Sequence, residues 1–166
     1  MKKIMLALFL TISMMSFSLD GHLRFGGVTN ANSYNKSDNE FDNYSPTFGL
    51  EVTQSFLLFD LGAGITHNRK ISGTDISTTP AYLLARWNII PIVIKPYIVA
   101  KVGKDIYTRE NASGNIKGKE YYAAGVGMNF SVLQAELLYS VTNMDGDKRG
   151  NSNLEQLSVV FGYKFF

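Results

Sequence analysis

The chain has 166 residues, of which 45% are hydrophobic and 18% are charged, and it contains no cysteine. This length fits one domain, and the composition excludes a disordered chain, a disulfide-stabilised scaffold and a bundle of membrane helices. The formal charge of +2 falls to 0 without Lys2 and Lys3, which argues against a general nucleic-acid-binding protein.

The first residues have the plan of a secretory signal peptide. Two lysines open the segment, an apolar run follows, and the small residues Ser16 and Ser18 occupy the positions that a signal peptidase reads. The alternative is an N-terminal anchor or core helix, but the apolar run is too short to cross a bilayer. We therefore predict a cleavable signal peptide at 1–18 and a mature domain at 19–166, outside the cytoplasm.

Eight segments of the mature chain alternate in hydrophobicity with a period of two. Such alternation puts aliphatic and aromatic side chains on one face of a strand and small, polar or charged side chains on the other. A continuous apolar run at 89–94, around Pro91, is interpreted as a turn at the membrane surface. The eight predicted strands are 19–28, 44–54, 56–66, 77–88, 95–104, 119–130, 131–142 and 154–166.

The connections between these strands alternate between long and short. The long ones, at 29–43, 67–76, 105–118 and 143–153, are polar and rich in Asn, Ser, Asp, Lys and Gly. Outer-membrane barrels have long extracellular loops and short periplasmic turns, and alternating strands keep the mean hydropathy near zero, here −0.02. The sequence therefore predicts an all-β, eight-stranded antiparallel up-and-down transmembrane β-barrel, with both termini on the periplasmic side of a bacterial outer membrane.

A soluble eight-stranded barrel, such as a lipocalin, or a β-sandwich would show the same alternation with the faces reversed. A water-facing side should then be rich in Lys, Glu and Thr. The non-aliphatic face instead carries Gly62, Gly64, Gly125, Gly127 and several tyrosines. Small residues suit a crowded interior, so the glycines favour the membrane barrel.

The end of the chain adds a short motif. Residues 162–165 read Gly-Tyr-Lys-Phe, which resembles the G-Y-[RK]-F ending of the small outer-membrane barrels of the OmpA, OmpX and opacity-protein type. The resemblance covers the whole mature length. It implies that the barrel-assembly machinery reads the terminal aromatic residues Tyr163, Phe165 and Phe166, although Phe166 is one residue more than the motif contains.

Aromatic residues on the apolar face gather at two heights, as expected where a barrel meets the two membrane interfaces. Trp87 and Phe130 fall near the short turns, and Tyr122 and Tyr139 fall toward the long loops. We interpret these four residues as members of two aromatic girdles.

The opposite face carries charges that must be paired if it is an interior of low dielectric. We predict an interior network made of Arg24, Glu51, Asp60, Arg86, Lys101 and Glu136. Such a network is either a filled structural core or a gate in a narrow ion path. An eight-stranded barrel is just wide enough for its own side chains, which favours the core.

The sequence contains no nucleophile elbow, metal-ligand spacing or phosphate loop, and only two histidines, His22 and His67. We predict no catalytic residue, metal or cofactor. The expected function is a structural or surface-interaction role through the long loops. The alternatives are a narrow channel for ions or small solutes and, third, a lipid-modifying enzyme. The expected partners are outer-membrane lipid and lipopolysaccharide, the barrel-assembly machinery and a surface ligand of the loops, but no nucleic acid.

Overall fold

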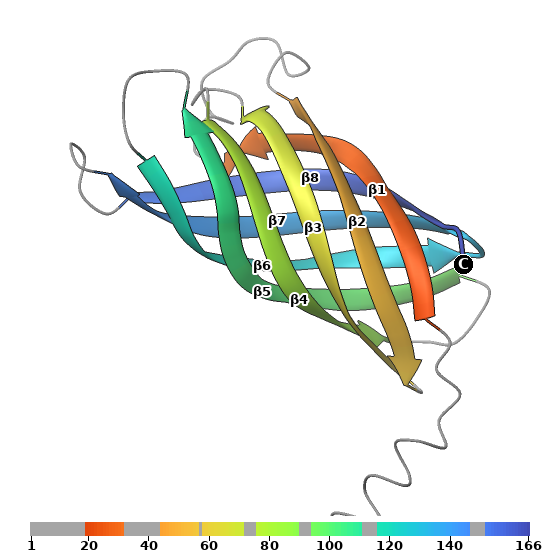
Figure 1. The fold of residues 1–166 in the computed structure, drawn as a ribbon. Coiled ribbons are helices and arrows are strands. Elements are labelled where there is room, and N and C mark those ends of the chain that lie inside the picture. Colours follow the sequence, from red (N-terminus) through yellow and green to blue (C-terminus); the bar gives the residue numbers. More distant parts are fainter. Residues whose placement is uncertain are drawn as a thin grey trace, which may run out of the picture.

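The computed structural model describes residues 19–31, 44–56, 58–71, 76–89, 94–110, 116–146 and 152–166. They form eight antiparallel strands that follow one another around a closed barrel (Figure 1). The strands are β1 (Leu19–Asn30), β2 (Ser45–Phe56), β3 (Phe59–Ile71), β4 (Ile76–Asn88), β5 (Ile94–Glu110), β6 (Ile116–Phe130), β7 (Leu133–Gly146) and β8 (Ser152–Lys164). The all-β up-and-down barrel predicted from the alternation is confirmed.

The barrel closes through the pairing of its first and last strands, with Phe25 opposite Phe161. Closure leaves no sheet edge without a partner, which is what a lipid environment demands. Figure 1 shows the start of β1 and the C-terminus at the same end of the barrel. The tight turn between β6 and β7 lies there too, and its Ser131 has a φ of 55°, in the left-handed region.

The strands are longer than the sequence predicted at the opposite end, where the longer connections lie. β3 continues to Ile71, β5 to Glu110 and β7 to Gly146, and β6 already begins at Ile116. β1 likewise continues to Asn30. All four predicted long loops, 29–43, 67–76, 105–118 and 143–153, therefore include paired strand residues, which is a correction. These residues are largely polar on both faces, so they show no apolar period although their backbones pair. The predicted signal peptide at 1–18 and the remaining parts of the loops lie outside the described residues.

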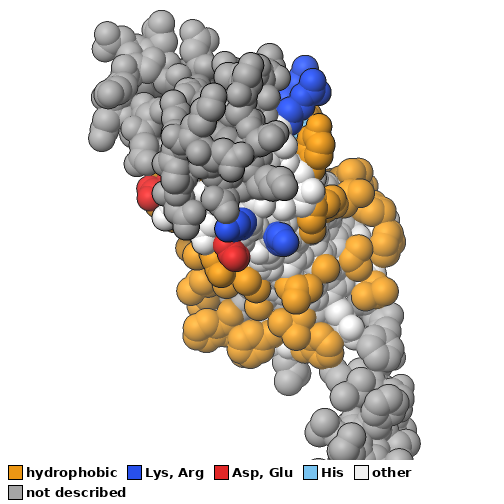
Figure 2. Space-filling model, turned by 60° about the vertical axis from the view of Figure 1, so that its left-hand side comes forward, with side chains coloured by type: hydrophobic (Ala, Val, Ile, Leu, Met, Phe, Trp, Pro, Cys, Tyr) orange, Lys and Arg blue, Asp and Glu red, His pale blue; other side chains and the backbone are white. Residues whose placement is uncertain are grey.

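The outward face is apolar. Large hydrophobic side chains from every strand are exposed, with Leu83 at 64% and Val126 at 56% of their full accessibility. Figure 2 shows them as a nearly continuous apolar belt over the visible face of the barrel, with the charged side chains gathered toward one end. Among the described residues, no helix has the length and hydropathy needed to cross a bilayer. Leu61, Ala100, Leu137 and Phe161 all lie on this exposed face.

The inward face is buried and mostly polar, with inward glycines where bulky side chains need room. A Cβ at Gly127 would lie 2.5 Å from Tyr97 Cζ, and one at Gly64 would lie 2.7 Å from Glu51 Cγ. Sequence reasoning missed one feature, a cluster of buried apolar residues inside the barrel toward its long-loop end. It consists of Val28, Ile76, Met144 and Leu154.

Candidate functional site

Five charged side chains meet in the barrel interior. Arg24 of β1, Glu51 of β2, Arg86 of β4, Lys101 of β5 and Glu136 of β7 are each no more than 5% exposed. All five point inward because they fall on the polar face of their strands. The stagger between strands then brings residues that are distant in sequence to a common level of the lumen. We call this set the charge cluster.

Both acids of the charge cluster are shared among its three cations. Arg24 Nη1 donates to Glu51 Oε2 at 2.8 Å, and the Arg24 guanidinium also pairs with Glu136. Lys101 Nζ lies 2.7 Å from Glu51 Oε1 and 3.3 Å from Glu136 Oε2. Arg86 Nη2 pairs with Glu51 and lies 3.1 Å from Glu136 Oε1. Three cations thus enclose two carboxylates, with a net charge of +1 within this set.

Neutral side chains complete the coordination of the carboxylates. The hydroxyl of Tyr82 donates to Glu51 Oε1, and that of Tyr97 donates to Glu136 Oε1, both at 2.8 Å. Gln134 Oε1 accepts a hydrogen bond of 2.8 Å from Arg24 Nη1. The same two rings lie beneath cations, since Lys101 Nζ is 4.8 Å from the Tyr82 ring centroid and Arg86 Cζ is 5.5 Å from that of Tyr97. This dense coordination offsets the cost of burying the charges.

Sequence analysis missed Tyr82, Tyr97 and Gln134 as members of this site. The strand alternation predicts that these three side chains face the lumen, but it does not predict their contacts. The inward glycines opposite them gave a partial signal, since a Cβ at Gly127 would meet Tyr97 and one at Gly64 would meet Tyr82. An inward glycine on the adjacent strand, paired with a tyrosine, indicates that the tyrosine ring fills the space beside it.

Asp60 lies apart from the charge cluster. It is buried and is the cross-strand neighbour of Arg86, yet the bonds of Arg86 go to the two glutamates. The Asp60 carboxylate instead accepts a hydrogen bond of 3.1 Å from Asn88 Nδ2. Its role in the structure is therefore to line the polar end of the lumen next to the short turns.

Among the described residues, one cavity lies on each side of the charge cluster. The larger, about 310 Å³, is at the short-turn end, and its lining includes His22, Asp60, Arg86 and Asn88. The smaller, about 20 Å³, is toward the long-loop end, and Arg24 and Lys101 line it. A space of 20 Å³ holds little more than one water molecule. The charge cluster therefore occupies the lumen between the cavities as a filled layer.

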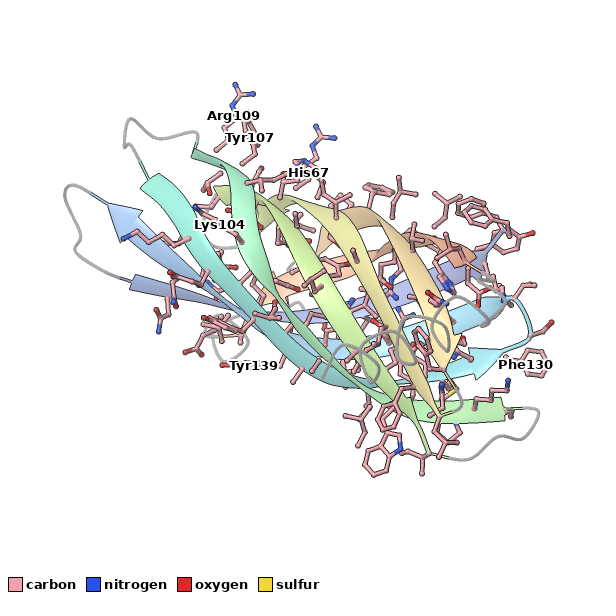
Figure 3. The ribbon with its side chains drawn as sticks, turned by 60° about the horizontal axis from the view of Figure 1, so that its bottom comes forward. His67, Lys104, Tyr107, Arg109, Phe130 and Tyr139 are labelled. Carbon is pink, nitrogen blue, oxygen red and sulfur yellow. The ribbon has the colours of Figure 1, made fainter. Side chains whose placement is uncertain are left out.

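The four predicted girdle residues are all exposed on the outer wall, each between 45% and 53%. Trp87 stacks on Phe59 of the neighbouring strand, with ring centroids 6.3 Å apart. Phe130 lies at the short-turn end in Figure 3, whereas Tyr139 lies farther along the wall. Tyr122 pairs with Val141 and Val102 on the strands beside it.

The predicted assembly residues lie at the end of β8. Tyr163 faces outward beside Leu23, whereas Phe165 and Phe166 follow the strand. The Phe165 N–H donates to the Gly21 carbonyl at 2.9 Å, and the Gly21 N–H donates to the Phe166 carbonyl at 3.1 Å. The last two residues therefore continue the pairing with β1, so the extra Phe166 has a defined place in the barrel.

Each histidine contacts a threonine. His22 Nε2 lies 3.1 Å from Thr53 Oγ1 inside the barrel, and His67 Nδ1 lies 2.9 Å from Thr79 Oγ1 on the outer wall. Within the described part of the chain, no three His, Asp or Glu side chains are grouped as potential metal ligands.

No protein-family model matches the sequence, and no curated protein matches it either. Solved structures do match. Neisserial surface protein A is 13% identical over 89% of this chain and 96% of that one, with a TM-score of 0.54. The outer membrane enzyme PagL is 13% identical over 88% of this chain and 99% of that one, with a TM-score of 0.52. One of these barrels is an enzyme, so the shared architecture does not decide the activity. The chain has the fold of the small eight-stranded outer-membrane barrels.

Proposed function

We propose that this protein is a non-enzymatic barrel of the bacterial outer membrane with a structural or surface-interaction role. The observation that carries the proposal is that the same strands have an apolar outer face and a charged inner face. The outside is a belt of exposed apolar side chains, and the inside holds charges that are paired with one another. A belt of this kind would be unstable in water and is stable in lipid.

The filled lumen supports a structural role over transport. The charge cluster separates the two cavities, and ion pairs with several hydrogen bonds each are costly to open. A barrel of this kind is a rigid, lipid-embedded platform. The connections at its long-loop end, including 32–43 and 147–151, would meet the cell surface and provide contact with a surface ligand.

The test is export and folding in a Gram-negative host. The proposal expects the chain to cofractionate with outer membranes, to shift in electrophoretic mobility on heating, and to lose residues 1–18. An inner-membrane or soluble fraction would contradict it. Phe161→Asp puts a charge in the belt and is compared with the wild type. It should reduce the folded, heat-modifiable form, because a charge facing lipid is costly.

A narrow channel is the second candidate, because both cavities are polar and Arg24 and Arg86 contribute to their linings. Planar-bilayer recording of the purified protein separates the two readings. If the role is structural, we expect no discrete conductance steps from the wild type and none from Arg24→Met. Conductance in the wild type that changes with Arg24→Met would replace the structural role with a gated path.

A further inference from the structure

The outer wall of the barrel carries an apolar groove of about 650 Å³. Its lining comes from strands β8, β1, β2, β3 and β4 and includes Tyr163, Leu23, Phe48, Ile65 and His67. Nothing in the proposed structural role requires a groove here, because a smooth apolar wall would meet lipid equally well.

The groove lies between two rows of outward side chains that run across the strands. One row is Phe25, Phe48, His67 and Thr79, and the other is Tyr163, Leu23, Leu50 and Ile65. Between the rows, Arg24 turns its side chain inward and its partner Gly49 has none, so backbone forms the floor there. The lining spans five neighbouring strands, from β8 to β4.

The groove runs from the short-turn end toward the long-loop end of the barrel. Tyr163 lies next to the end of β8, beside the short turns, whereas Thr79 lies only three residues after the start of β4, beside the long loops. There the rows continue onto β5, where Tyr107 is opposite Thr79 and Lys104 is opposite Ala81. The pairing of β4 with β5 shifts its register at this point, and both Ile106 and Tyr107 are exposed. The irregularity turns the strand so that Tyr107 continues the row.

Exposed cationic side chains follow the groove residues on β3 and β5, farther toward the long-loop end. Arg69 lies two residues beyond His67 on β3, and Arg109 lies two residues beyond Tyr107 on β5, opposite Ser77. Both arginines and Lys104 are exposed. In Figure 3, Arg109, Tyr107 and His67 point away from the barrel at the end opposite Phe130. Lys104 has an acid, Glu120, as its cross-strand neighbour on β6, so Arg69 and Arg109 are the stronger anion ligands.

We propose that the groove and the two arginines together bind one phosphorylated glycolipid of the lipopolysaccharide class from the outer leaflet. An acyl chain lies in the groove, and the phosphate at the sugar end meets Arg69 and Arg109, with Lys104 and His67 beside it. Guanidinium groups are well suited to phosphate, and the order of apolar wall, aromatic ring and cation matches the order of such a lipid from chain to headgroup. This inference rests on the proposed outer-membrane location and assigns a lipid site to one side of the barrel.

The experiment is native mass spectrometry of the exported protein, purified in detergent, delipidated and titrated with diphosphoryl lipid A. The expected result is one saturable lipid per barrel, with affinity that falls as salt rises. Arg69→Gln with Arg109→Gln should weaken binding by about tenfold, since each exposed charge contact contributes a modest amount. Phe48→Ala removes one wall of the groove and should also weaken binding. Lys95→Gln, at the short-turn end of β5, should leave it unchanged.

Three results would overturn the proposal: equal affinity of the double arginine variant and the wild type, equal binding of lipid A with its phosphates removed, or a dimer that covers the groove in place of lipid. Heat-modifiable mobility of each variant reports folding separately. Loss of that mobility shift in the wild type would reject the outer-membrane barrel itself, whereas an intact shift with unaltered lipid binding would reject the glycolipid site alone.

Discussion

The inward and outward faces of each strand share one backbone but differ in burial and in the contacts that their side chains make. On the lumen side of β7, Glu136 is 2% exposed and engages all three cations of the charge cluster. One residue farther on, Leu137 is 46% exposed and has no polar group to satisfy. The inside is held together by specific pairing, whereas the outside needs only apolar character. Substitutions inside should therefore be sensitive to identity, and substitutions outside should be sensitive to polarity alone.

Breaking the charge cluster should have the largest effect. Glu136→Leu leaves Arg24, Arg86 and Lys101 with one carboxylate between them, and removing one partner of a buried pair costs about 3–5 kcal/mol. Denaturant unfolding of the refolded protein, followed by the heat-modifiable band, measures the loss. Glu120→Leu is the matched control, because Glu120 is exposed on the outer rim, and should change stability by less than about 0.5 kcal/mol. Equal stability of both variants would show that the charge cluster is not a structural core.

Placing a charge on the belt should have the next largest effect. Val126 is 56% exposed and lies on β6 between the girdle residues Tyr122 and Phe130. Val126→Arg should cost about 2–4 kcal/mol in a bilayer, because a cation then faces the middle of the lipid. The same unfolding measurement in lipid vesicles checks this, with Val126→Leu as the neutral control. A cost near zero would mean that the belt does not face hydrocarbon.

Overfilling the lumen should cost less. A Cβ at Gly127 would lie 2.5 Å from Tyr97 Cζ, so Gly127→Val should destabilise the barrel by about 1–3 kcal/mol. Ala124→Val, on the outward face of the same strand, adds a similar volume and should be nearly neutral. Comparing their unfolding midpoints isolates the crowding of the interior. If the two variants match, the inward glycines do not serve to make space.

The smallest expected effect is on lipid hydrolysis, for which we expect no activity. His67 and Thr79 form a hydrogen bond within the lining of the groove, but we expect no turnover there if the protein is not an enzyme. Lipid A incubated with the wild type should release no fatty acid above a protein-free blank, and His67→Ala should give the same result. Release by the wild type that His67→Ala abolishes would make the groove a catalytic site.

The end of the chain shows how far local pattern can predict. The alternation over 154–166 predicts a terminal strand, and β8 does span Ser152–Lys164. It does not predict that Phe165 and Phe166 would continue bonding to Gly21. The same limit appeared at the long-loop end, where strand residues with polar side chains on both faces were interpreted as loops.

The sequence by itself determined the fold class, the number of strands and the face on which each side chain lies, because a strand repeats every two residues and that period is local. The alternation also grouped the inward charges into one predicted network. Only the tertiary structure decided which of them form pairs, since Arg24 and Glu136 are 112 residues apart and register and stagger bring them together. It also separated Asp60 from that cluster and showed that Arg69 and Arg109 are exposed on strands near the long-loop end of one groove. Contacts across strands depend on how the barrel closes, which no single strand encodes.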